Sequence, residues 1–236
     1  MNKKILSQED LKLIACITML IDHFGVAIIP HLPLANKVTI YYICRGIGRI
    51  AFPIYCFLLA EGMRHTRNAG KYILRLAVGI LLAELPFDFL FEGGFTWADQ
   101  SVMVTLTLGA VMLLCMQKTE KKELKLLLIL PFAVMAEIAK CDYGGWGIAV
   151  IAVFALFEQF PLQFLGLQLI CILMPFAAIS VLGIPVSAEL AALFAMIPIG
   201  FYSGQKLTHS RMLQWAFYLF YPVHMLILWG ILLLLG

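Results

Sequence analysis

The sequence predicts an all-α integral membrane protein that forms a single domain over residues 1–236. Hydrophobic residues make up 62% of the chain and charged residues only 13%, against about 25% charged residues in an average soluble domain. Apolar runs of about 20 residues, the length of a membrane-spanning helix, recur along the sequence. The length allows about nine such helices with short loops and leaves no stretch for a separate soluble domain.

Hydropathy and helix-breaking residues set the limits of these expected spans. The N-terminal basic residues precede an apolar run without a small-residue cleavage site, so we expect the first span to be retained. Phe160-Pro161 and Gly183-Ile184-Pro185 indicate turns around the seventh span. The expected spans are 11–29, 38–63, 72–91, 101–117, 124–140, 146–160, 164–182, 187–203 and 212–235.

The distribution of positive charge predicts that the N-terminus is cytoplasmic. With this orientation, all but four of the 17 Lys and Arg residues lie in the inner segments. Lys37 and Lys140 lie outside, and Arg45 and Arg49 lie within a span. This excess of cytoplasmic basic residues follows the positive-inside rule. We therefore expect a multi-pass cell-membrane protein surrounded by lipid, and no basic patch suits nucleic acid.

Several ionisable residues fall where lipid is expected. Asp22 and His23 are adjacent in the first span, and Arg45 and Arg49 are four residues apart in the second, which places both guanidinium groups on one helix face. Ionisable groups within a membrane are costly and usually functional. Two cations so close together require anions, supplied by a ligand or by acidic residues such as Asp22 and Asp88.

Five of these residues share a depth in the predicted membrane. At ~1.5 Å per residue, His23, Glu84, Glu137 and His224 lie about 18 to 20 Å from the cytoplasmic start of their spans. Arg45 descends ~10 Å from the outer edge of a core ~30 Å thick and reaches the same layer. Each of these side chains, taken singly, also suits an interhelical hydrogen bond. Together they predict a polar chamber enclosed by apolar helices.

Lys12 lies on the same helix face as His23. It precedes the histidine by eleven residues, and eleven steps of ~100° return to within about 20°. Lys12 is then ~16 Å closer to the cytoplasm, where it marks an approach to the histidine or serves as a snorkelling anchor. Gly46 and Gly48 beside the arginines, with Pro53 after them, permit either close approach of another helix or an irregular turn at membrane depth.

This combination of side chains suits acyl transfer. A histidine is readily poised as a base near neutral pH, and Asp22 or a facing carboxylate would orient His23. Arginines nearby would stabilise an oxyanion or bind phosphates. No His-x-x-x-His or Glu-x-x-His pair marks a metal site, so no metal is expected. The sequence also lacks a Gly-x-Ser-x-Gly elbow, a Walker loop and a dinucleotide fingerprint.

Four segments of the chain resemble the TraX family, whose members are named for the conjugative protein that acetylates the N-terminus of F-type pilin. They are Leu20 to His23, Gly48 to Gly62, Asp142 to Gly147 and Phe217 to His224. The family is similar to a wider superfamily of transmembrane acyltransferases. In its O-acetyltransferase branch an Arg or Lys precedes a His of the first span by eleven positions, as Lys12 precedes His23.

The resemblance implies an acetyltransferase of the bacterial cytoplasmic membrane. Acetyl-CoA would be the cytoplasmic co-substrate, and the acceptor would be an extracytoplasmic protein N-terminus or glycan. We expect His23, Asp22, Arg45 and Arg49 to be catalytic. Residues expected to bind substrate or cofactor are Glu84, Asp88, Glu137, Asp142, Tyr221 and His224, with Lys12, Arg64, Arg67 and Lys71 holding the CoA phosphates.

Two other classes of function fit the same residues. A proton-coupled transporter or exporter also carries His, Arg and carboxylates in one layer, although such proteins commonly show internal repeats that this sequence lacks. A non-catalytic assembly factor would use the charges only to join helices.

Overall fold

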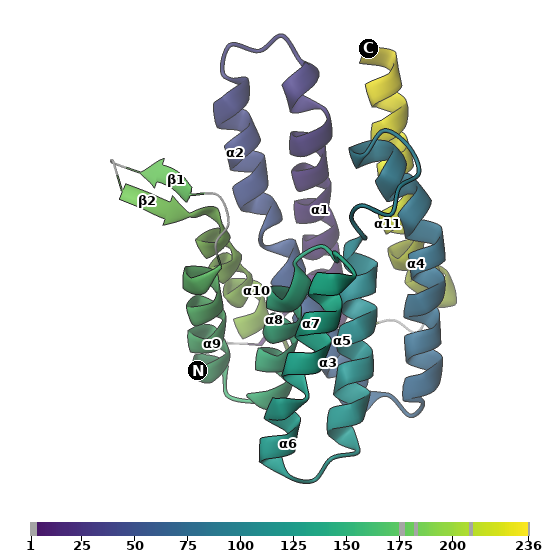
Figure 1. Ribbon diagram of the computed structural model, residues 1–236, viewed down its shortest axis with the longest axis vertical. Coiled ribbons are helices and arrows are strands. Elements are labelled where there is room, and N and C mark those ends of the chain that lie inside the picture. The colour runs from purple at the N-terminus through teal and green to yellow at the C-terminus, as the bar shows by residue number, and fades with distance from the viewer. Residues whose placement is uncertain (1–3, 175–177, 182–183, 208–209, 236) are drawn as a thin grey trace.

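The computed structural model describes residues 4–174, 178–181, 184–207 and 210–235. Its described part is a bundle of helices with one two-stranded β-hairpin (Figure 1). The elements are α1 (Gln8–Ala27), η1 (Ile29–His31), α2 (Lys37–Gly48), α3 (Ala51–His65), α4 (Ala69–Phe91), α5 (Val102–Gln117), α6 (Lys122–Leu127), α7 (Ile129–Ile138), α8 (Gly144–Leu156), α9 (Phe160–Leu173), β1 (Ala178–Val181), β2 (Ile184–Ser187), η2 (Ala188–Ala195), α10 (Met196–Gly200) and α11 (Arg211–Leu235).

The predicted helical class is confirmed, and three helical segments are long and apolar enough to cross a membrane. Among the described residues these are Gln8–His31, Lys37–His65 and Met212–Leu235. Helices α5, α8 and α9 are apolar but shorter. The nine spans and the cytoplasmic N-terminus therefore stay predictions.

Two of the expected spans are each divided into two helices. The span 38–63 divides into α2 and α3 at Arg49 and Ile50, and the span 124–140 divides into α6 and α7 at Leu128. Pro53 and Pro131 lie in the first turn of the second helix of each pair, where proline is tolerated but cannot continue the hydrogen bonding of the helix before it. The break at Arg49 fits the irregular turn expected from Gly46, Gly48 and Pro53. The break at Arg49 turns the chain so that α2 packs on α1 while α3 enters the core.

The expected span 164–182 was wrong in its second half. Helix α9 ends at Leu173 because Met174, which precedes Pro175, is already extended, and a residue before proline is disfavoured in the α region. Strands β1 and β2 follow and pair antiparallel, with Ala178 opposite Ser187. The predicted turn at 183–185 lies partly outside the described residues. The expected span 187–203 is helical as η2 and α10.

Helix α3 forms the centre of the bundle. It packs against α1, α5 and α8, and the side chains of Ile54 and Cys56 are fully buried. The outer faces of other helices are apolar and exposed, with Leu81 at 75%, Ile138 at 78% and Leu234 at 88% exposure. An apolar helix face of this kind, with nothing packed against it, is typical of contact with lipid.

Helices α1 and α2 lie side by side in the upper part of Figure 1, and α4 lies beside α11 at the right. A capping box starts α1, because the Ser7 hydroxyl accepts from the Asp10 backbone N–H at 3.1 Å and Asp10 accepts from the Ser7 N–H at 2.8 Å. Two glycines let α2 approach α1: a Cβ at Gly25 would overlap Cys44, and one at Gly48 would overlap Asp22. Gly48 is thus required for this spacing, whereas Gly46 has room.

Candidate functional site

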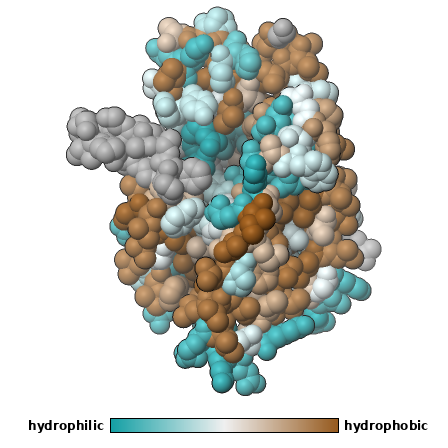
Figure 2. Space-filling model, in the orientation of Figure 1, coloured by the Kyte–Doolittle hydropathy of each residue, from teal (hydrophilic) through white to brown (hydrophobic). Residues whose placement is uncertain are grey.

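A polar cavity of about 580 Å³ lies between α1, α2, the end of α4 and the loop before α8. Figure 2 shows hydrophilic side chains around a hollow on this face, bordered below by hydrophobic surface. Several residues singled out in the sequence come together here, from segments far apart in the chain. The expected residues on its wall are Asp22, His23, Arg45, Arg49, Glu137 and Asp142.

Arg45 is paired with Asp22 across the α1–α2 contact. Its Nη1 donates to both carboxylate oxygens of Asp22, at 2.8 and 2.7 Å. The Asp22 side chain is 12% exposed and the Arg45 side chain 28% exposed. The close approach at Gly48 holds the carboxylate against α2, so this ion pair is positioned by helix packing.

Arg49 is more deeply buried and has different partners. Its side chain is 8% exposed, and its Nη1 lies 3.1 Å from the carboxylate of Glu189, which is 4% exposed. The same guanidinium donates to the Tyr143 hydroxyl at 3.0 Å. The Tyr143 ring stacks on Phe52, with ring centroids 3.8 Å apart. One arginine thereby links α2, the loop before α8 and the η2 segment.

The loop that carries Asp142 and Tyr143 is held in an unusual backbone conformation. Tyr143 has φ 64° and Gly144 has φ 47°, the left-handed region that non-glycine residues rarely adopt. Two contacts fix the turn: the Thr105 hydroxyl donates to the Asp142 carbonyl, and a Glu137 carboxylate oxygen accepts from the Gly145 N–H at 2.8 Å. Such local strain persists only where surrounding contacts determine it, and it is frequent at functional sites.

Asp142 adds an acidic group to this wall. Its side chain is exposed to the cavity yet surrounded by protein, and the loss of hydration raises the pKa of the carboxyl to about 6, against the opposing attraction of Arg49. At neutral pH the group is therefore largely ionised.

His23 is paired with His224 of α11. Nδ1 of His23 lies 2.7 Å from Nε2 of His224, and the two ring planes differ by 11°. Phe91 and Tyr221 contact the His23 ring edge-on, at centroid distances of 5.3 and 6.2 Å. We expected Asp22 or a facing carboxylate to orient His23; the structure instead places a second imidazole there and gives Asp22 to Arg45.

A second, apolar cavity of about 170 Å³ reaches Tyr221, the edge-on neighbour of this histidine pair. Lys12 and Met19 line it from α1, and Phe217 and Tyr221 line it from α11. The Lys12 ammonium lies 5.4 Å from the centre of the Phe217 ring, within cation–π range. Tyr221 lines this cavity and His23 lines the polar one, so the contact between these two rings, with His224 against both, lies between the two cavities.

Glu84 and Asp88 do not line either cavity. Both oxygens of Glu84 accept from the backbone N–H of Ser101, at 3.2 and 3.3 Å, and the Ser101 hydroxyl donates to it at 2.6 Å. Glu84 therefore neutralises the start of α5. Asp88 accepts from the Thr96 N–H at 3.1 Å and ties down the loop after α4. The sequence had left open whether a ligand or acidic residues such as Asp88 would neutralise the arginines, and the structure pairs them with Asp22 and Glu189.

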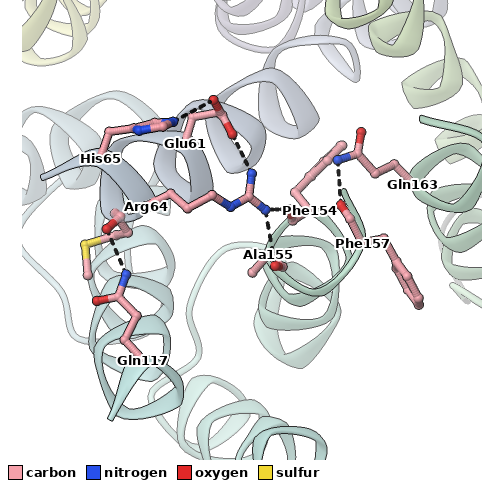
Figure 3. A network of polar contacts seen from close by, with 9 residues as sticks. Glu61, Arg64, His65, Gln117, Phe154, Ala155, Phe157 and Gln163 are labelled. Carbon is pink, nitrogen blue, oxygen red and sulfur yellow. Dashed lines mark hydrogen bonds and ion pairs between the residues drawn. The ribbon is translucent and has the colours of Figure 1, made fainter. Parts of the chain in front are cut away.

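Arg64 is held by the protein at the lower end of the bundle (Figure 3). It donates to Glu61 at 2.5 Å and to the carbonyl oxygens of Phe154 and Ala155 at 2.9 and 3.2 Å. These carbonyls belong to the last turn of α8, so Arg64 acts as a cap from another helix. Arg67 and Lys71 are exposed.

Two buried groups of the site escaped the sequence reasoning. Glu189 was detectable as a single acid in an apolar stretch, the signal that identified Asp22 in the first span. Tyr143 was noticed only within a motif, because no sequence signal reveals its left-handed backbone. Among the described residues, no group of three or more His, Cys, Asp and Glu side chains could hold a metal ion.

Long apolar helices around a buried cluster of ionised side chains define the chain as a helical membrane protein with an internal polar site. The chain belongs to the TraX family, because the family model described as TraX protein matches residues 7–232. It is 31% identical over 241 residues to a probable fimbrial assembly protein, FimC of serogroup H1, from Dichelobacter nodosus, with 94% of each chain covered. No solved structure matches the chain.

Proposed function

We propose that the chain is a multi-pass acyltransferase of the bacterial cytoplasmic membrane. It would move an acetyl group from cytoplasmic acetyl-CoA to an amine or hydroxyl at the outer side. The observation that carries this proposal is the pair of cavities separated by His23, His224 and Tyr221. A reaction that joins a donor from one side of a membrane to an acceptor from the other requires this layout.

The apolar cavity suits the donor. Its small volume and its lining by Lys12, Met19, Tyr55 and Tyr221 suit the long, thin pantetheine arm of CoA. Lys206 lies close enough to Lys12 for the two cations to repel each other. Such a pair of cations is stabilised by phosphate.

The basic residues that we propose as ligands of the CoA phosphates differ in part from those expected from the sequence. Arg75 stands 5.7 Å from the centre of the Tyr72 ring, and Tyr72 lines the apolar cavity. Arg75 therefore joins Lys12 and Lys206 as a phosphate ligand in this proposal. Arg64 is already engaged with Glu61 and the end of α8, so it leaves the set.

The polar cavity suits the acceptor. With Asp22 paired to Arg45 and Glu189 to Arg49, its wall retains one cation, Lys140, against the carboxylates of Glu92, Asp99, Glu137 and Asp142. This acidic surplus favours an acceptor that carries positive charge, such as the ammonium group of a protein N-terminus, over an anionic one. The relative named as a fimbrial assembly protein supports an acceptor among surface-fibre subunits. A glycan hydroxyl is the other candidate.

His23 is the proposed general base. An ammonium acceptor first gives one proton to solvent in the polar cavity and reacts as the neutral amine. His23 then takes a proton from the acceptor N–H or O–H while the acceptor atom bonds to the thioester carbonyl carbon. Arg45 or Arg49 stabilises the negative charge that develops on the carbonyl oxygen. The C–S bond then breaks, and the proton passes from His23 to the sulfur, which leaves as free CoA thiol. A variant of this route carries the acetyl group on His23 before the acceptor attacks.

The test is CoA release by the purified protein in lipid vesicles, with acetyl-CoA outside and an amine-bearing peptide supplied to either face. We expect His23→Ala to lower the rate about 1,000-fold while unfolding at the same temperature as wild type. His31→Ala, which changes an exposed histidine, serves as the matched control and should leave the rate unchanged. Undiminished CoA release by folded His23→Ala would refute the role of His23.

A proton-coupled transporter remains the second candidate, because cavities on two sides of a polar layer also suit alternating access. The two functions differ in one measurement. A transporter would move a solute with a pH gradient in vesicles that contain no acetyl-CoA, whereas the proposed acyltransferase would bind acetyl-CoA in calorimetry and be idle without it.

A further inference from the structure

We propose that His224 is a positioning residue that fixes the tautomer of His23, so that Nε2 of His23 is the basic nitrogen. This inference rests on the proposed function and names the group that prepares its base. His224 is 4% exposed, and α11 brings it to His23 from 201 residues away in the sequence. Two hydrogen bonds in series determine which nitrogen carries each proton.

The series begins at the backbone carbonyl of Phe220. This oxygen lies 2.7 Å from Nδ1 of His224, and a carbonyl oxygen can only accept. Nδ1 of His224 therefore carries a hydrogen. In a neutral imidazole only one nitrogen is protonated, so Nε2 of His224 presents a lone pair.

That lone pair faces Nδ1 of His23 at 2.7 Å. For a hydrogen bond to form, Nδ1 of His23 must donate, which leaves Nε2 of His23 without a proton. The reverse arrangement would set two lone pairs against each other, either at Phe220 or between the rings. The backbone of α11 thus selects one tautomer of a histidine on α1 through the His224 ring.

Aromatic neighbours hold the two rings in this register. The Phe220 ring lies 4.7 Å from the His224 ring and nearly parallel to it, and Tyr221 contacts both histidines edge-on. No carboxylate takes the orienting role: among the described residues, His23 hydrogen-bonds to His224, whereas Asp22 is occupied by Arg45.

The pair also accounts for the charge that forms during transfer. When Nε2 of His23 takes the acceptor proton, the ring becomes an imidazolium, and its Nδ1–H donates more strongly to the neutral His224. Delivery of the Nε2 proton to the departing sulfur restores the starting tautomers. No proton needs to leave His224 in the cycle, which separates positioning from acid–base catalysis.

Two substitutions at one position test the inference. In His224→Gln the amide oxygen can still accept from Nδ1 of His23 and the amide nitrogen can donate to the Phe220 carbonyl. His224→Phe keeps an aromatic ring among aromatic neighbours but can do neither. We expect His224→Phe to lower kcat about 100-fold, with the KM for acetyl-CoA within about 2-fold of wild type, and His224→Gln to recover at least about 10-fold of that loss.

A purely structural role predicts the opposite order, because Phe would preserve packing and Gln would disturb it. Wild-type kcat in His224→Phe, or a folded His224→Gln no more active than His224→Phe, would overturn the inference. Nitrogen-15 NMR of histidine-labelled protein gives a readout independent of turnover. It should report Nδ1 of His23 as protonated in wild type and as mixed between tautomers in His224→Phe; a protonated Nε2 in neutral wild type would also overturn it.

These measurements separate the inference from the proposed function. If wild-type protein released no CoA but NMR found the assigned tautomer and its loss in His224→Phe, the acyltransferase proposal would fail and the positioning would stand. If CoA were released and neither substitution mattered, the reverse would hold.

Discussion

Different interactions hold the walls of the two cavities in place. The polar cavity of about 580 Å³ is walled by ion pairs and by a strained loop, and each arginine there has a carboxylate within 3.1 Å. The apolar cavity of about 170 Å³ is walled by aromatic and aliphatic side chains around Lys12. Charge pairing fixes the first, whereas the shape and packing of five helices, α1, α3, α4, α5 and α11, fix the second. The same bundle can therefore hold a site for polar chemistry beside a slot for a flexible chain.

The largest expected effect comes from removing the buried cation of the polar cavity. Arg49→Leu deprives Glu189 of its ion-pair partner at 4% exposure and should destabilise the fold by ~3–5 kcal/mol. Arg45→Leu, at a side chain 28% exposed, should cost clearly less because solvent can screen the charge left on Asp22. Denaturant unfolding in detergent measures both. Equal losses would contradict the distinction between buried and cavity-exposed pairs.

The helix spacing beside that cavity is the next target. Gly48→Ala introduces a Cβ into the space of the Asp22 side chain, and overpacking of this kind costs ~1–3 kcal/mol. Gly46→Ala is the matched control, since its nearest neighbour is the Ala191 Cβ at 3.9 Å. The unfolding temperature should fall in Gly48→Ala and stay at the wild-type value in Gly46→Ala. A similar fall in both variants would mean that Gly48 is needed for the backbone conformation of α2 and not for its contact with Asp22.

Substitutions in the lining of the apolar cavity should change the binding of acetyl-CoA rather than the stability of the fold. Lys12→Ala removes the cation at its lining and should raise the KM for acetyl-CoA about 10-fold with little change in kcat, since a uniform binding contribution is lost. Lys118→Ala is the matched control, because Lys118 is exposed and lines neither cavity. Steady-state kinetics distinguish the two variants. If Lys118→Ala raised KM and Lys12→Ala did not, the donor would enter elsewhere.

The smallest effect is expected outside both cavities. Arg64→Ala removes a cap from the last carbonyls of α8 and should cost ~1 kcal/mol of stability. The KM for acetyl-CoA should stay at the wild-type value, because Arg64 already has protein partners. The two quantities come from thermal unfolding and from the same kinetic assay. A raised KM at unchanged stability would return Arg64 to the set of phosphate ligands.

The sequence anticipated best what depends on local composition. The helices at 72–91, 101–117 and 212–235 follow from predominantly apolar runs, and Asp22, Arg45 and Arg49 stood out because charge is rare in such runs. Partner choice could not be predicted in the same way. The pairing of Arg49 with Glu189 and of His23 with His224 depends on which helices are neighbours, and the sequence alone does not state this.

The predicted depth of a residue in the membrane indicated only in part which residues lie close together. His23, Arg45 and Glu137, assigned to one layer, do line one cavity, and His224 contacts His23. Glu84 has the same expected depth but faces the start of α5. A count of residues along a helix gives height in the membrane, whereas direction around the axis depends on packing. The left-handed Tyr143 was likewise hidden, because its conformation is imposed by Thr105, Glu137 and Phe52 from other segments.

The hydrogen-bond series at His23 has a consequence for the energetics of the membrane. A protein with a cavity toward each compartment risks short-circuiting the proton-motive force if a chain of exchangeable protons joins them. Here the series ends at the Phe220 carbonyl, which has no proton to pass on and no tendency to accept one. Tyr221 packs edge-on against both histidines beside this series. In the proposed acyltransferase, the pair of histidines would then be a dead end for proton conduction, so a base could work between two compartments without passing protons from one to the other.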